Sequence, residues 1–107
     1  RSILVSRKKL KDKTREKVIV DEKVITVTYE IYIRNNKSIA VSLDVNDQIP
    51  LSNDPTIKVE LLKSDGASYN AETGMLEWKL DLKAKENKKL QFTYEVKIPK
   101  DKSLAGL

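Results

Sequence analysis

Apolar and polar residues alternate along most of this chain, and the alternation is clearest over residues 90–98. Five apolar residues occupy every second position of that run: Leu90, Phe92, Tyr94, Val96 and Ile98. A period of two places successive side chains on opposite faces of an extended strand, so that one face enters a core and the other meets water. The pattern predicts a half-buried β-strand over residues 90–98 that stops at Pro99.

Four other runs alternate in the same way. Their inward phases begin at Ile25, Ile39, Ile57 and Leu76, and they are rich in the β-branched and aromatic types that suit a pleated, half-buried surface. Trp78 falls on the inward phase of its run, so we expect it to anchor the core. Two weaker stretches, 3–10 and 16–20, are also expected to be strands, separated by a polar turn at residues 11–14.

Turn signals divide these runs at regular intervals. They lie at residues 34–37, 46–55, 64–66 and 70–74, where Asn, Asp, Pro and Gly gather. No window shows the helical i, i+3, i+4, i+7 spacing better than it shows alternation. Turns every 8 to 12 residues are typical of an all-β sandwich or barrel, and the apolar faces must meet across two layers. The sequence therefore predicts a sandwich of about seven antiparallel strands.

The polar connector at residues 83–89 leaves the strand order open. If it closes a hairpin, the favoured registers place Glu77 opposite Lys97 and Lys79 opposite Glu95, because like charges across a ladder repel. If it crosses between sheets, as a Greek key requires somewhere, that pairing does not exist. The sequence is compatible with both arrangements.

Length and charge bound the organisation of the chain. Its 107 residues suit one domain, residues 1–107, with one core, and it contains no run of 18 apolar residues and no signal peptide. It lacks an initiator Met, so we expect an excised module of a longer protein, and the sequence does not indicate where that protein is located.

The net charge is +5, yet residues 1–17 alone carry a net +6. The positive excess thus lies entirely in the first segment.

That basic segment is the first candidate site. Six of its side chains could bind phosphates or an anionic polysaccharide: Arg7, Lys8, Lys9, Lys11, Lys13 and Arg15. Nucleic-acid binders usually interleave aromatic residues or use one helical face, and neither occurs here before Tyr29. Lys on an edge strand also protects a sheet against aggregation. We favour edge protection over polyanion binding, and we do not expect a nucleic acid as partner.

Other chemistry is sparse. The absence of Cys and His removes disulfides, thiolate nucleophiles, imidazole bases and the usual zinc ligands. One loop region carries oxygen ligands that suit Ca²⁺, namely Asp44, Asn46, Asp47 and Asp54. That set lacks the Gly and distal Glu of an EF-hand, and turn capping by Asp47 and Asn53 is the simpler interpretation. The carboxylates of Asp44 and Asp47 have no partner group to separate their pKa values, so we expect neither enzyme activity nor a metal or cofactor. Tyr32 and Tyr69 are the expected exposed aromatics, on a strand and in a loop respectively.

Several motifs together resemble the C-terminal part of the bacterial mucoidy inhibitor A family. They are residues 29–37, Asp47-Gln48-Ile49-Pro50, residues 57–59, Thr73-Gly74 before the Trp78 strand, and Phe92-x-Tyr94-x-Val96 ahead of Pro99-Lys100. The resemblance implies an immunoglobulin-like or fibronectin-like sandwich at the C-terminus of a longer, exported protein with a helical middle region. It implies no catalytic residues. We therefore expect a non-catalytic structural or interaction module of the cell envelope, whose partners are other domains of the same protein or another envelope protein.

Overall fold

The computed structural model describes residues 2–17 and 21–101, with the backbone alone described at 11–13 and 15–17. Within these ranges the chain forms no helix, and so none that could cross a membrane. The described residues form seven strands: β1 Ile3–Lys17, β2 Glu22–Asn35, β3 Val41–Gln48, β4 Lys58–Lys63, β5 Ser68–Asn70, β6 Met75–Leu82 and β7 Asn87–Pro99. The predicted all-β class and number of strands are confirmed.

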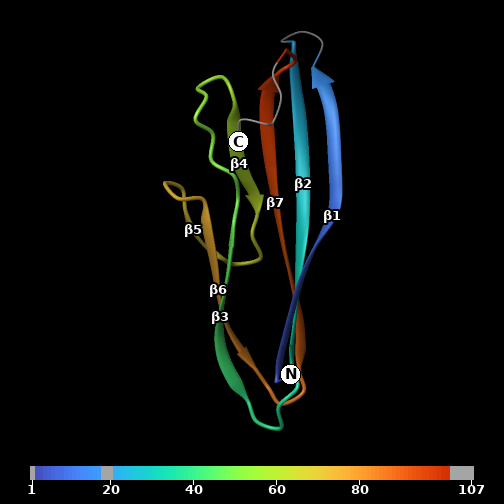
Figure 1. The fold of residues 1–107 in the computed structure, drawn as a ribbon, viewed down its shortest axis with the longest axis vertical. Helices are drawn as coiled ribbons and strands as arrows, with labels where there is room; N and C mark the ends of the chain where they lie inside the picture. Colours follow the sequence, from blue (N-terminus) through green and yellow to red (C-terminus); the bar gives the residue numbers. More distant parts are fainter. Residues whose placement is uncertain (1, 18–20, 102–107) are drawn as a thin grey trace.

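The seven strands form two sheets in which every neighbouring pair is antiparallel. The larger sheet has the order β1-β2-β7-β4 and the smaller one β3-β6-β5. β2 and β7 run the length of an elongated molecule of 56 × 25 × 21 Å, and β3 and β6 face their lower halves (Figure 1). An immunoglobulin constant domain has the orders 1-2-5-4 and 3-6-7. The fifth and seventh strands have exchanged sheets relative to that order.

The main core fills the space between the two sheets. Its buried residues come from alternate positions of β2, β3, β6 and β7 together with the residue after β3: Ile31, Ile33, Val45, Ile49, Leu76, Trp78, Leu80, Leu82, Leu90 and Phe92. Every position in this group lies on an expected inward phase except Ile49, which lies inside the turn signal at residues 46–55. The alternation over residues 76–82 and 90–98 therefore identified the core face correctly, including Trp78.

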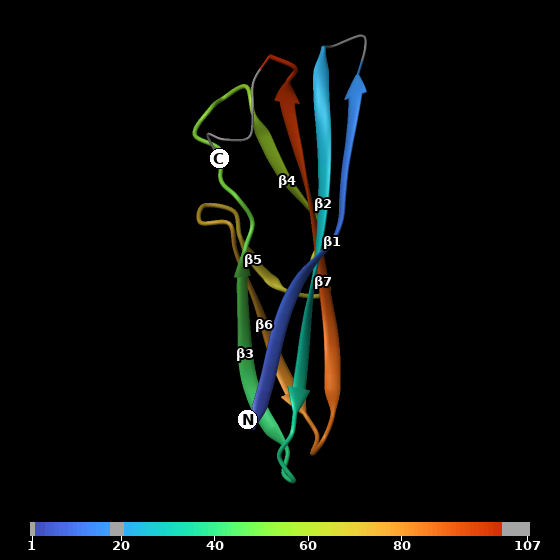
Figure 2. The ribbon, with the colours of Figure 1, turned by 45° about the vertical axis from the view of Figure 1, so that its right-hand side comes forward.

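A second, smaller apolar cluster continues the core along the upper half of β2 and β7. It contains Ile25, Val27, Ile57, Val96 and Ile98, with Val59 of β4 packed against it. Here the smaller sheet no longer covers β2 and β7, and Figure 2 shows β4 and the loop before it on that side instead. Together the two clusters line one face of β2 from Ile25 to Ile33 and of β7 from Leu90 to Ile98.

The connector after β6 crosses between the sheets. β6 pairs with β3 and β5, whereas β7 pairs with β2 and β4, so Glu77 and Lys97 are not cross-strand partners. The hairpin alternative is thereby excluded. Charge does not set the β4–β7 register either, since Glu60 lies opposite Glu95 in that ladder. Burial of the apolar phase outweighs a repulsion of a few tenths of a kcal/mol to about 1 kcal/mol.

The side chain of Asn35 holds together the end of the molecule where the β6–β7 connector crosses between the sheets. Its side chain is fully buried, and its Nδ2 donates to the carbonyl oxygens of Ile39 at 2.9 Å and Lys83 at 3.0 Å. Its Oδ1 accepts from the backbone N–H of Lys37 at 3.0 Å. The turn expected at residues 34–37 is therefore confirmed, and one amide side chain joins it to the β6–β7 crossing.

Three expectations about strands were wrong. Residues 3–17 form one continuous β1 with a register shift between Lys9 and Lys11, where a turn between two strands was expected; residues 18–20 lie outside the described residues. Ile39 precedes β3 and is 65% exposed, because β3 begins only at Val41. Tyr69 lies in the short strand β5 rather than in a loop. β1 and β5 are edge strands whose described side chains are almost all exposed, so they carry a weak hydrophobic pattern.

Candidate functional site

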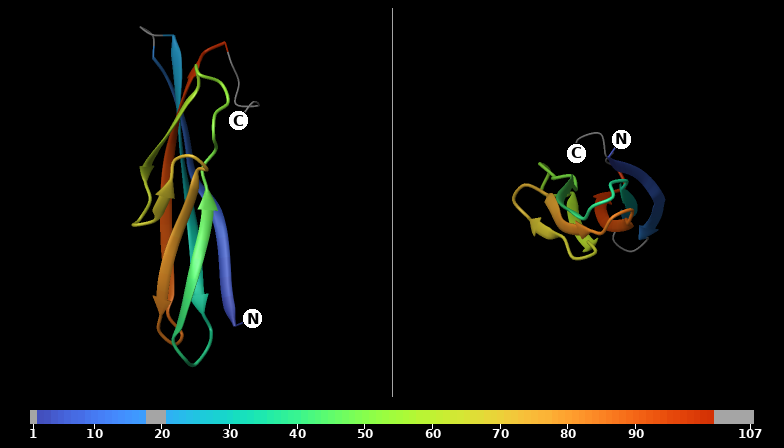
Figure 3. Two further views of the ribbon diagram at one scale, coloured as in Figure 1. Left: turned by 90° about the vertical axis from the view of Figure 1, so that its left-hand side faces the viewer. Right: turned by 90° about the horizontal axis from the view of Figure 1, so that it is seen from below.

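The six basic candidates all lie on β1, the outermost strand of the larger sheet. Seen along the long axis, β1 forms the rim of the molecule (Figure 3, right). Arg7, Lys8 and Lys9 pair in register with Ile31, Glu30 and Tyr29 of β2. Lys11, Lys13 and Arg15 pair with Thr28, Thr26 and Val24, but their side chains lie outside the described residues. The structure thus brings the six positions onto one edge.

Arg7 is engaged by the fold. Its Nε donates to Oδ2 of Asp47 at 2.8 Å, which joins β1 of the larger sheet to β3 of the smaller one. The Arg7 side chain is 46% exposed and that of Asp47 only 11%. The guanidinium also lies 3.9 Å from the ring centre of Tyr29, within cation–π range. Arg7 therefore closes one open side of the two-layer structure.

The contact continues into the core through aromatic rings. Tyr29 stacks on Phe92 with ring centres 5.5 Å apart, and Phe92 meets Trp78 at 6.0 Å. Burial lowers the pKa of the Arg7 guanidinium, but the hydrogen bond and charge of Asp47, with Tyr29, raise it by more. Arg7 is therefore protonated at neutral pH. Its position is explained by packing and charge pairing, without any ligand.

Lys8 and Lys9 lie on opposite faces of the sheet. The Nζ of Lys8 is 3.9 Å from Oε1 of Glu30 on the outer face, and its side chain is 69% exposed. Lys9 follows Arg7 on the other face, with its Nζ 5.9 Å from the Tyr29 ring centre. Of the three described basic side chains, Lys8 is the one on the outer face.

The acidic candidates do not converge. Asp44 and Asn46 pair in register with Lys79 and Glu77 on the outer face of the smaller sheet, whereas Asp47 turns toward Arg7. Asp54 accepts from the backbone N–H and the hydroxyl of Thr56 at 2.8 and 2.7 Å. Across the described ranges, no three acidic side chains form a group that could hold a metal ion. Asp47 also accepts from the N–H of Gln48, its neighbour at the end of β3, so this bond is not a turn cap.

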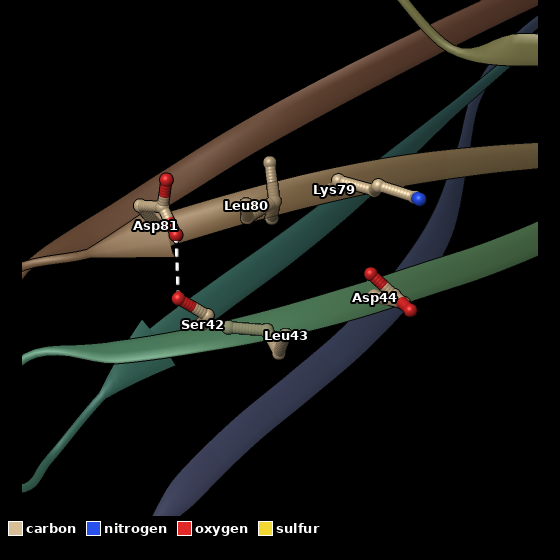
Figure 4. A pocket seen from close by; sticks show the side chains of 6 residues that line it. All are labelled: Ser42, Leu43, Asp44, Lys79, Leu80 and Asp81. Carbon is tan, nitrogen blue, oxygen red and sulfur yellow. Dashed lines mark hydrogen bonds between the residues drawn. The ribbon is translucent and has the colours of Figure 1, made fainter.

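The outer face of β3 and β6 carries a shallow hollow of about 530 Å³. Figure 4 shows it lined by Ser42, Leu43, Asp44, Lys79, Leu80 and Asp81. The hydroxyl of Ser42 donates to Oδ1 of Asp81 at 2.6 Å. A hydroxyl held by a carboxylate resembles the start of a catalytic pair, but neither side chain is buried, so the carboxylate stays solvated and the hydroxyl is not activated.

The outer face of the larger sheet is polar along β2. The hydroxyls of Thr28 and Thr93 are 2.9 Å apart, and Glu30 accepts from Nε2 of Gln91 at 3.4 Å. Tyr32 is half-buried on this face, and Tyr69 is 39% exposed on β5. The two tyrosines lie in different sheets, so they do not form one stacking platform for a sugar.

One surface feature escaped the sequence analysis. Three apolar side chains of β1 are exposed: Leu4 and Val5 before its basic residues and Leu10 among them, with exposures of 42%, 52% and 38%. Their presence in an expected strand was visible, but only the strand order shows that β1 is an edge. Large apolar side chains on an exposed edge are a feature of interaction surfaces.

Comparison with known proteins gives one match. The profile of DUF4139, a domain of unknown function, matches residues 1–100. No curated protein and no solved structure matches the chain. Because the matched region covers nearly the whole sequence, including all seven strands and both core clusters, the chain belongs to the DUF4139 family.

Proposed function

We propose that this chain is a non-catalytic interaction module of a larger bacterial envelope or exported protein of the mucoidy inhibitor A family. The observation that carries the proposal is the exposure of three large apolar side chains on the edge strand β1, namely Leu4, Val5 and Leu10. The ion pair of Arg7 with Asp47 is consistent with the proposal because the pair joins the two sheets and so serves the fold. The motif resemblance supports the family and the envelope setting.

Polyanion binding, the alternative raised by the basic segment, receives less support. A phosphate or sulfate on Arg7 would have to compete with the carboxylate of Asp47 at 2.8 Å. A charge-assisted pair of this kind holds its geometry more strongly than a neutral hydrogen bond does. The alternative is therefore retained as an outcome to be measured and not as a second proposal.

Affinity purification of the parent protein from its own cells tests the module. Four forms are compared: the intact protein, a form without this domain, a Leu4→Ser/Val5→Thr variant, and a Leu62→Ser variant. Leu62 lies on β4, the other edge of the same sheet, and is 49% exposed, so it is a matched control. We expect a partner that is lost with the domain and in the β1 variant and retained in the control. An unchanged set of partners after deletion of the domain would refute the proposal.

A further inference from the structure

We propose that β1 is a docking edge for an extended, acidic segment of a partner protein, which adds to the larger sheet as a fifth strand. The inference rests on the proposed function, because it names the surface and the partner class of that interaction module. Four observations support it: the direction of the backbone groups of β1, its charge, its exposed apolar side chains, and the contrast with β4.

The hydrogen-bond register shows which backbone groups of β1 face outward. The N–H of Asn36 donates to the carbonyl oxygen of Ser2 at 2.9 Å, so Ser2 and Asn36 form a hydrogen-bonded pair. Such pairs alternate along an antiparallel ladder, so the backbone groups of Ile3, Val5 and Arg7 point away from β2. Within the described ranges no strand pairs with β1 on that side. An added strand would find a row of donors and acceptors there.

Charge selects the class of partner. Residues 1–17 carry a net +6, so pairing β1 with a second copy of itself would place like charges against each other. A strand with carboxylates at alternate positions would instead place opposite charges beside the basic residues of β1. Lys8 lies on the outer face with its side chain 69% exposed and its Nζ 3.9 Å from Glu30, a distance too long for a hydrogen bond. It can therefore turn toward a carboxylate on the neighbouring strand.

The exposed apolar surface of β1 determines which residues the partner strand needs on its second face, the one without carboxylates. Val5 pairs with the fully buried Ile33 on the core side of the sheet, yet half of its own surface is exposed because nothing follows it in the sheet. An apolar side chain on an added strand would cover Val5. The partner segment is therefore expected to alternate apolar residues with Asp or Glu. The other edge of this sheet, β4, has six residues and carries both signs of charge in Lys58, Glu60 and Lys63.

The test uses a capped synthetic heptapeptide of alternating Val and Glu, with a Val and Lys version as its control. Amide hydrogen exchange of the ¹⁵N-labelled domain is followed by NMR as each peptide is added to millimolar concentration. We expect the Glu peptide to slow exchange at Val5 and Arg7, whose N–H groups point outward. Exchange at Leu4 and Ser6, which bond to β2, should change far less, and the Lys peptide should have no effect.

Three variants separate the contributions of backbone and charge. Val5→Pro removes an outward N–H without breaking a β1–β2 hydrogen bond and should weaken binding by about tenfold or more. Lys8→Gln should weaken it roughly two- to fivefold at low salt, as expected for an exposed charge pair. Lys58→Gln on β4 is the matched charge control and should bind like the wild type. Circular dichroism of each variant checks that the fold is kept, and the Lys8 result stands even if Pro distorts β1.

Each of the other outcomes overturns the inference. Protection on β4 or in the loops would assign docking to another surface, while leaving the interaction module to be judged by the purification experiment. Equal binding of the Lys peptide would show that charge does not select the partner. Salt-sensitive binding of a heparin fragment at β1, with no protection by the Glu peptide, would identify a polyanion site. No binding of the Glu peptide at millimolar concentration would refute the docking edge.

Discussion

The ion pair between Arg7 and Asp47 provides the sharpest test of how the two sheets are held together. We consider Arg7→Ala, Asp47→Asn and the double variant. Arg7→Ala removes a 2.8 Å charge-assisted hydrogen bond and a guanidinium 3.9 Å from the Tyr29 ring. Asp47→Asn removes the charge but keeps an oxygen that can still accept from the N–H of Gln48.

The expected magnitude follows from exposure. A hydrogen bond to a charged group contributes about 1.5–3 kcal/mol when well buried, whereas an exposed ion pair contributes only about 0.2–1 kcal/mol. Asp47 is 11% exposed but Arg7 is 46% exposed, so solvent screens the pair and the lower half of the combined range applies. The cation–π contact adds about 0.5–1 kcal/mol. We therefore expect Arg7→Ala to cost about 1–2 kcal/mol, and the two single changes to be coupled by about 1 kcal/mol.

The assay is urea unfolding followed through the fluorescence of Trp78, the single Trp of the chain and a buried reporter of the core. All variants are measured in one buffer, because the coupling energy is obtained by subtracting small changes in the free energy of unfolding from one another. Lys8→Ala is the matched control: Lys8 is adjacent on β1 and is 3.9 Å from its carboxylate partner, so its loss should cost below about 0.5 kcal/mol. Unfolding of Arg7→Ala within about 0.3 kcal/mol of the wild type, or strict additivity of the two changes, would refute the role given to the pair.

Three further changes test the core, the crossing and the β4 edge. Trp78→Ala should destabilise the domain by about 3–5 kcal/mol in thermal unfolding, because it empties the core and leaves the carbonyl of Ser64 without its 2.7 Å donor. Asn35→Asp should cost about 2–4 kcal/mol in chemical unfolding, since a buried carboxylate would face two carbonyl oxygens. Glu60→Lys should gain about 0.2–1 kcal/mol in the same assay, because it removes the repulsion with Glu95.

Each of these changes also has a result that would contradict its reasoning. A shift in the melting temperature of Trp78→Ala no larger than that of a surface variant would mean that the residue does not anchor the core. Wild-type stability of Asn35→Asp would show that the amide does not donate to both carbonyls. A loss of stability in Glu60→Lys that persists at high salt would show that Glu60 contributes through packing and not through charge.

The sequence predicted the interior strands well because each has one buried face. On β6 and β7 the burial alternates at Leu76, Trp78, Leu80 and Leu82 and again from Leu90 to Ile98. The alternation of apolar and polar residues in the sequence follows this alternation of burial. Among the edge strands, β3 and β4 keep an alternating burial pattern, whereas β1 and β5 lack it. The described side chains of β1 are all exposed except Ile3, so no buried face distinguishes this strand from a polar loop.

The candidate site was predicted in part. The basic residues of the first segment do lie together on an edge, as their clustering suggested. The partner of Arg7 could not be found from the sequence, because Asp47 is 40 residues away and lies in the other sheet. Their meeting depends on how β1 of one sheet faces β3 of the other, which the alternation within each strand does not specify. The alternation within a strand specifies which of its faces is buried, but not which strand pairs with it.

The register shift in β1 gives its charge pattern a structural meaning. Before the shift, Arg7 and Lys9 pair with the odd-numbered series of β2 that also contains the core residues. After it, every second position of β1 pairs with the even-numbered series that contains Glu30, the partner of Lys8: Lys11, Lys13 and Arg15. Without the shift these three positions would pair with the core series. The strand therefore has two groups of basic positions, and the fold uses the first through Arg7, whereas docking of an acidic strand would use the group that begins with Lys8.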